Sequence, residues 1–185
     1  MSNRIRSRLR KMAILRILVA CITVSAIVCC GFLRRPRQSE KINEQAEFNN
    51  NIFRIRVTAY AEENAGFVGG AYYVFESAPA GSNDWGKIVT VRHDDPIPIP
   101  RQQIRFVSDK VAYVFMIWTY AVTTDGGSTW KVWDAFKDLP QLQDHPAIDE
   151  VQIKLDGTGR MTFKSSTVTA PELHTDDYGK HWQAE

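Results

Sequence analysis

The chain has 185 residues and a formal net charge of +2, but this average hides two segments of opposite charge. Nine of the 23 Lys and Arg residues lie within the first 37 positions, and the first acidic residue is Glu40. Beyond that segment 14 basic residues face 21 acidic ones, a net charge of −7 that would repel a phosphate backbone. Composition therefore argues against nucleic-acid binding by the domain.

An uncharged apolar run extends from Ile17 to Leu33. If the Arg16 guanidinium reaches the membrane interface, the run lengthens to 12–33, which suffices for one transmembrane helix of about 20 apolar residues. Six basic residues precede the run and four closely follow it. This asymmetry favours a cytoplasmic N-terminus and a periplasmic or extracellular domain.

Two processing alternatives stay open for this segment. "LVAC" at 18–21 resembles a lipoprotein cleavage box that would be cut before Cys21, and "VSA" at 24–26 fits a cleaved signal peptide. Both would leave an apolar remnant on the mature chain, so the length favours an uncleaved anchor. Cys21, Cys29 and Cys30 all lie in this run, which predicts neither a disulfide nor a metal or cofactor site in the domain.

The chain divides into a basic segment (1–11), the anchor (12–33), a linker (34–51) and a domain (52–185). Within the linker, 38–51 ("QSEKINEQAEFNNN") is polar and lacks a sustained apolar period, which indicates a linker or a short exposed helix. The domain is rich in β-branched and aromatic residues and is broken every ten residues or so by Gly, Asp and Pro clusters. We therefore expect an all-β fold.

Strands are predicted in chain order, with an extended proline-rich spacer at 94–100 and room for a helical turn within 137–150. A tight hairpin is expected at Asp156–Gly159, where two glycines supply the required backbone freedom. The predicted strands are 52–60, 71–78, 87–93, 103–108, a long one at 111–124, 129–136, 151–155 and 160–165.

An octapeptide of the form [S/T]-x-D-x-G-x-x-W occurs twice, at 123–130 and 175–182, and a weaker copy at 82–89 has Val where Trp is expected. Similar strand–turn–strand segments precede the two full copies. Asp84, Asp125 and Asp177 are 41 and 52 residues apart, close to the period of roughly 40 to 50 residues seen in propeller blades.

These octapeptides resemble the Asp-box, or BNR repeat, of sialidases, sortilin-type receptors and photosystem II assembly-factor propellers. The resemblance implies about three blade-like repeats, arranged as an incomplete or open propeller or as a sandwich. It also implies a structural role, because in that family the turn joins the outer strands of a blade away from the ligand face. The structural residues would be Ser82, Asp84, Gly86, Thr123, Asp125, Gly127, Trp130, Thr175, Asp177, Gly179 and Trp182.

Other candidate clusters have simple structural interpretations. "FRIR" at 53–56 resembles the FRIP motif of sialidases but replaces its proline with Arg56. The run His93-Asp94-Asp95 would converge on one ligand only within a loop, and Glu172 and His174 directly precede the last octapeptide. We therefore expect no catalytic residue, metal or cofactor.

The predicted function is that of a membrane-anchored, extracytoplasmic, non-enzymatic binding or scaffold module. Its partner would be another protein or a second copy of the chain, because three blades leave two free ends with unpaired backbone groups. Alternatives are an immunity or inhibitor protein against a secreted toxin, and a small sialidase-like, glycan-acting enzyme. The candidate partner anchors are the aromatic residues Tyr113, Phe115, Trp118 and Tyr120, with packing of either pair in the core as the alternative. Period-2 alternation puts Tyr113 and Phe115 on the opposite face from the other two.

Overall fold

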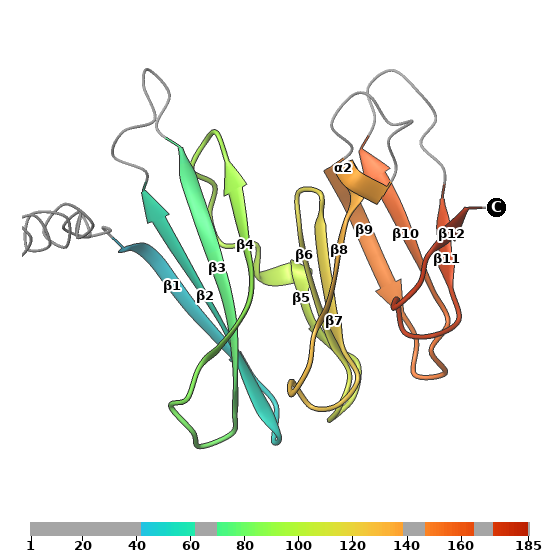
Figure 1. Cartoon of the computed structure of the whole chain (residues 1–185), viewed down its shortest axis with the longest axis horizontal. Helices are drawn as coiled ribbons and strands as arrows, with labels where there is room; N and C mark the ends of the chain where they lie inside the picture. Colours follow the sequence, from blue (N-terminus) through green and yellow to red (C-terminus); the bar gives the residue numbers. More distant parts are fainter. Residues whose placement is uncertain (1–41, 62–69, 139–146, 165–171, 185) are drawn as a thin grey trace, which may run out of the picture. The chain divides into compact units, whose positions relative to one another are not determined.

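The computed structural model describes residues 42–61, 70–138, 147–164 and 172–184. Their strands form three four-stranded antiparallel sheets that follow one another along the chain, and none of these described sheets closes on itself (Figure 1). The fold is all-β, as predicted. The segments 1–11, 12–33 and 34–41 lie outside the described residues, and within the described ones no helix is long and apolar enough to cross a membrane.

The first sheet consists of β1 (Ile42–Asn49), β2 (Phe53–Ala61), β3 (Ala71–Pro79) and β4 (Gly86–His93), paired in that order. β2 and β3 largely alternate between buried and partly exposed positions, as expected for strands with one face in a core. The strands predicted at 52–60, 71–78 and 87–93 are confirmed to within one residue at each end.

Strand β1 corrects the interpretation of residues 38–51 as a linker or short exposed helix. It pairs with β2 in antiparallel register, with Ala46 opposite Val57. Ala46 is buried and Phe48 packs against the adjacent core, while most other β1 side chains are polar and exposed. An edge strand needs few apolar residues, so the hydrophobic pattern did not reveal it, and the sheet begins at Ile42 instead of Ile52.

The second sheet consists of β5 (Ile104–Phe106), β6 (Ala112–Met116), β7 (Thr119–Thr123) and β8 (Lys131–Asp134), preceded by the 3-10 turn η1 (Arg101–Gln103). The single strand predicted for 111–124 is wrong, because β6 and β7 form a hairpin that turns at Ile117 and Trp118. Ile117 has a φ of 57°, in the left-handed region that glycine usually occupies. Both turn carbonyls are bonded from elsewhere, since Ala135 N–H donates to Trp118 O at 2.8 Å and Ile148 N–H donates to Ile117 O.

The third sheet follows the short helix α2 (Ala135–Asp138) and contains β9 (Ala147–Ile153), β10 (Gly159–Lys164), β11 (Leu173–Thr175) and β12 (Gln183–Ala184). The predicted hairpin between β9 and β10 is confirmed. Its turn is closed by Lys154 N–H donating to Thr158 O at 2.8 Å, and Gly157 takes a φ of 91°. The spacer at 94–100 contains no strand.

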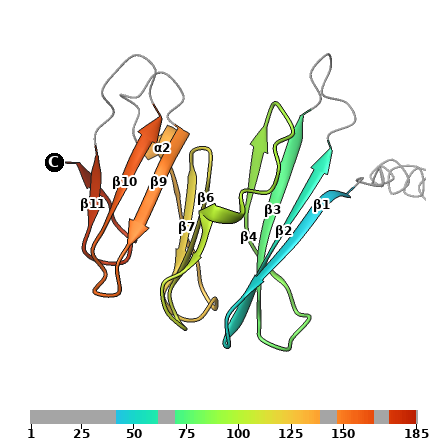
Figure 2. The ribbon, with the colours of Figure 1, turned by 180° about the vertical axis from the view of Figure 1, so that it is seen from behind.

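Two cores hold the three sheets face to face, and both ribbon views place the second sheet between the others (Figures 1 and 2). β6 and β7 are buried at every position, so the second sheet faces a core on each side. The core between the first two sheets includes Phe53, Ile55, Val57, Tyr73, Phe75, Val114 and Met116. The core between the second and third sheets includes Tyr113, Phe115, Tyr120, Val122, Ile148, Val151, Met161 and Leu173.

The outward faces of the first and third sheets carry ion pairs. Arg56 Nη2 lies 2.7 Å from Glu76 Oε2 on the first sheet, and Arg160 Nη2 lies 3.2 Å from Glu150 Oε2 on the third. Charged side chains on these faces can be solvated by water. Because the sheets stack by their faces, the two ends of the described stack are sheet faces and not the strand edges expected from the sequence.

Candidate functional site

Each of the three described sheets carries one copy of the repeated octapeptide between its third and fourth strands. The copy at 82–89 begins in the β3–β4 connection, the copy at 123–130 spans the connection from β7 to β8, and the copy at 175–182 spans that from β11 to β12. We call these segments the first, second and third turns. Their equivalent positions allow a direct comparison of side-chain roles.

The second turn is organised around the Asp125 carboxylate. Asp125 Oδ1 accepts hydrogen bonds from Thr123 Oγ1 at 2.8 Å and from the backbone N–H of Thr129 at 2.9 Å, while Oδ2 accepts from Thr129 Oγ1 at 2.5 Å. Thr123 Oγ1 in turn accepts from the N–H of Gly127 at 3.0 Å. Both carboxylate oxygens are therefore occupied by donors from the same eight residues.

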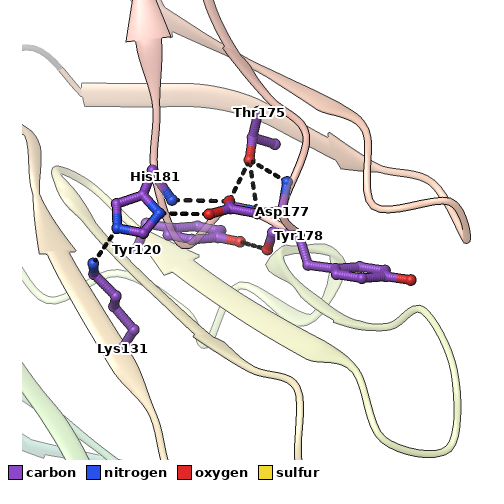
Figure 3. A network of polar contacts seen from close by, with 7 residues as sticks. Tyr120, Lys131, Thr175, Asp177, Tyr178 and His181 are labelled. Carbon is purple, nitrogen blue, oxygen red and sulfur yellow. Dashed lines mark hydrogen bonds and ion pairs between the residues drawn. The ribbon is translucent and has the colours of Figure 1, made fainter.

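The third turn repeats this arrangement around Asp177 (Figure 3). Asp177 Oδ1 accepts from Thr175 Oγ1 at 2.9 Å and from the N–H of His181 at 3.0 Å, and the N–H of Gly179 donates to Thr175 Oγ1 at 2.9 Å. The Oδ2 atom lies 2.5 Å from His181 Nδ1. His181 thus takes the place that Thr129 has in the second turn, with an imidazole donor instead of a hydroxyl.

These hydrogen bonds set the acidity of both carboxyl groups. Burial alone would raise the pKa of Asp125, but hydrogen bonds from the Thr129 side chain and backbone and from Thr123 outweigh it and lower the pKa. Burial likewise opposes ionisation of Asp177, and hydrogen bonds from the His181 side chain and backbone and from Thr175 lower its pKa to about 2. Both groups are ionised acceptors at neutral pH, unsuited to act as general acids.

An Asp–His–Lys row results in the third turn, since His181 Nε2 also lies 3.2 Å from the Lys131 ammonium of β8. The row looks like a catalytic relay, but the match between His181 and Thr129 explains the Asp–His contact as part of the turn. The His181 side chain is 71% exposed, so its contact with Lys131 lies in solvent. Surface contacts of this kind contribute little to stability.

The tryptophan that ends each full octapeptide contacts the preceding sheet. Trp130 Nε1 donates to Ser77 Oγ of β3 at 3.0 Å, and its ring lies edge-on to Phe53 of β2 at 6.4 Å between centroids. Trp182 lies edge-on to Tyr120 of β7 at 5.5 Å. Each full turn therefore fastens its own sheet to the one before it.

The turn glycines permit the same close approach. Gly127 has a φ of +84°, and a Cβ there would lie 2.7 Å from the Phe53 ring. Gly179 has a φ of +81°, and a Cβ there would overlap the Tyr120 hydroxyl. Glycine is required at both positions by backbone conformation and by contact with the preceding sheet.

The first turn keeps only part of this pattern. The N–H of Asp84 donates to Ser82 Oγ at 3.0 Å, but within the described residues the Asp84 carboxylate accepts none of the bonds made by Asp125 and Asp177. No described sheet precedes the first one, so within the described residues this turn contacts no preceding sheet. This accounts for Val89 at the tryptophan position and for Gly86 lacking a positive φ.

Trp85 of the first turn has a different role. Its ring lies beneath two arginines of the "FRIR" stretch, with the Arg54 and Arg56 guanidinium carbons 4.7 and 4.1 Å from the ring centroid. Arg54 Nη1 also lies 3.4 Å from Glu47 Oε2, and Arg56 is bonded to Glu76. Both guanidiniums are therefore held by carboxylates and an indole of the first sheet.

A groove of about 410 Å³ lies between the first and second turns. Its apolar surface includes Ile88 and Trp130, and its polar lining includes Asp84, Lys87 and Ser128. Gly86, Gly126 and Gly127 also line it. Sequence reasoning missed this groove, because its residues belong to two sheets and are brought together only by stacking.

The remaining candidate clusters stay apart from the turns. His93 Nδ1 lies 3.1 Å from the N–H and 2.6 Å from the carbonyl of Asp95, which makes a local loop contact. His174 Nε2 lies 3.7 Å from Glu172 Oε1. Among the described residues, no three His, Cys, Asp or Glu side chains gather as metal ligands.

The predicted partner anchors are mostly core residues. Tyr113, Phe115 and Tyr120 all lie in the second core, each no more than 5% exposed, and Trp118 is partly exposed in the β6–β7 turn. The hairpin explains this burial, because a turn at Ile117–Trp118 brings Phe115 and Tyr120 opposite each other on one face. These three residues are therefore unavailable as surface anchors.

Ser77, Thr129 and His181 are supporting residues that the sequence analysis did not single out. Aligning the two full octapeptides places His181 opposite Thr129, a signal that was present in the sequence. The hydrogen bond from Trp130 to Ser77 joins two sheets, so no local sequence pattern predicts it.

Comparisons of the chain with family models, with curated proteins and with solved structures gave no match.

Proposed function

We propose that the chain is a membrane-tethered, extracytoplasmic binding module that acts without catalysis, built on three Asp-box blades in an open stack. The observation that carries this proposal is the matched pair of turns at 123–130 and 175–182. In both, the repeated Asp carboxylate accepts hydrogen bonds from its own turn, and the tryptophan contacts the preceding sheet. The Asp and Trp residues of the two full octapeptides thus stabilise the turns and hold neighbouring sheets together.

The arginines of the "FRIR" stretch support a non-catalytic role as well. A sialidase-like enzyme needs a cluster of arginines free to bind a substrate carboxylate. Here Arg54 and Arg56 are already paired with Glu47 and Glu76 of neighbouring strands and covered by Trp85. Removing them from these partners would leave two carboxylates uncompensated on the same sheet face.

Tether and compartment follow from the apolar run 12–33 and the basic residues around it, which lie outside the described part of the chain. A stack with polar, ion-paired outer faces is suited to stand alone in an aqueous compartment. Such a module recognises a partner through its remaining exposed surface, with the acidic domain projected from the membrane by the anchor.

The test is fractionation of bacterial cells that express the full-length chain with a C-terminal tag. We expect the tag in the membrane fraction after alkaline carbonate washing, at the full-length mass, and degradation of the tagged domain when protease is added to spheroplasts. A parallel chain carrying Ile22→Arg and Val28→Arg should leave the carbonate-washed membranes. Recovery of the unaltered chain in the cytosol, or protection of its domain in intact spheroplasts, would contradict the proposal.

A further inference from the structure

We infer that the groove between the first and second turns is a docking site for an extended segment of a protein partner, which lies along the free edge of β4 and places an apolar side chain between Ile88 and Trp130. This inference rests on the proposed binding function and names the surface that performs it. The groove measures about 410 Å³, within the usual range for a binding pocket.

The strand beside the groove offers an unpaired edge. β4 is the last strand of the first sheet, and no described strand pairs with its outer side. It is eight residues long, whereas the corresponding last strands β8 and β12 have four and two. An exposed strand edge presents backbone donors and acceptors to an incoming extended chain.

Glycines keep this part of the groove open to another backbone. A Cβ at Gly86 would meet only Ser77 O, at 3.7 Å, and Gly126 and Gly127 bring bare backbone from the second turn to the opposite wall. Glycine in a strand often marks the close approach of a second backbone. A bulge in the β3–β4 pairing leaves Ile88 without a partner on β3, and Ile88 lines the groove.

Two unpaired charges give the site its selectivity. Asp84 carries a carboxylate that its turn does not use, in contrast to Asp125 and Asp177. Lys87 is exposed and makes no ion pair with any described residue. The complementary partner segment therefore has an apolar side chain flanked by one basic residue, toward Asp84, and one acidic residue, toward Lys87.

The experiment uses the full-length chain purified in mild detergent and a random peptide library displayed on phage. We expect enriched peptides with the apolar centre and opposite flanking charges. Their affinity, measured by fluorescence anisotropy with synthetic peptides, should fall about tenfold for Lys87→Glu and at least as much for Ser128→Tyr, which fills the groove. The control Lys154→Glu, in the separate hollow on the outer face of the third sheet, should bind within about twofold of the parent.

Exchanging the charges at Asp84 and Lys87 tests whether they select the flanking residues of the peptide. Peptides with the two flanking charges swapped should bind the double variant Asp84→Lys, Lys87→Glu better than the parent chain. Enriched peptides that bind the parent chain and the Lys87→Glu and Ser128→Tyr variants equally would show that the groove is not the docking site. Such a result would not contradict the proposed binding function. Failure to enrich any peptide on the parent would also overturn the groove, and the fractionation experiment reports separately on tether and compartment.

Discussion

The Trp182 ring stands edge-on to the Tyr120 ring, with the centroids 5.5 Å apart and the planes at 84°. Trp182 closes the turn of the third sheet, and Tyr120 is a fully buried residue of the second. The Tyr120 hydroxyl also donates to Tyr178 O, in the middle of the same turn, at 3.2 Å (Figure 3). One side chain therefore contacts the turn at two points. The contact shows how a local turn becomes a joint between sheets.

Gly179→Ala should destabilise the domain much more than Gly81→Ala. Both glycines have a positive φ, of +81° and +77°, so each substitution carries the left-handed backbone cost of about 1–2 kcal/mol. At Gly81 nothing lies within 4 Å of the added Cβ, whereas at Gly179 it would overlap the Tyr120 hydroxyl. Urea unfolding of the two variants measures the difference, and equal losses would show that the third turn does not press against the second sheet.

Acid should weaken the third turn over a defined pH range. The pKa of Asp177 is lowered to about 2 in the folded chain. Its ionised form therefore contributes stability that is fully present above about pH 4, the ordinary value for the unfolded chain, and is lost as the pH falls through about 2. Urea midpoints measured from pH 5 to pH 2 should fall more steeply for the parent than for Asp177→Asn. Parallel curves would mean that Asp177 is not held as an ionised acceptor.

His181→Thr should preserve the third turn, because threonine fills the matching position in the second turn and donates to its carboxylate. We expect a change in unfolding free energy within about 0.5 kcal/mol, against a loss of about 1 kcal/mol for His181→Ala, which removes the donor. Lys131→Ala should have little effect, since its contact is exposed. A large loss with His181→Thr would indicate that the imidazole has a role beyond the turn.

Local hydrogen-bond chemistry explains why the turns could be predicted from the sequence. Thr123, Asp125 and Gly127 satisfy one another within five residues, so their spacing carries the geometry. The β9–β10 hairpin was predictable for the same reason, since Gly157 supplies its positive φ directly. Features that depend on neighbouring residues in the chain left a readable pattern.

Features that depend on the stacking of the sheets could not be predicted from the sequence. The β6–β7 hairpin was hidden because both faces of the second sheet are buried, so its two strands form one continuous apolar run in the sequence. The turn is also unmarked by glycine, because Ile117 takes the positive φ there. β1 was hidden because an edge strand tolerates polar residues at most positions. The groove beside β4 is lined by Ile88 and Trp130 from different sheets, so no local sequence pattern predicts it.

A double-mutant cycle of Trp182→Leu and Tyr120→Leu tests whether the turns join each sheet to the preceding one. Leucine keeps apolar bulk and removes the edge-on ring contact. Unfolding free energies should show a coupling of about 0.5–1.5 kcal/mol between the two positions. Trp182→Leu combined with Phe53→Leu, whose ring lies in the other core, should be additive within about 0.5 kcal/mol. Additive losses for Trp182 and Tyr120 would mean that this ring contact does not join the third sheet to the second.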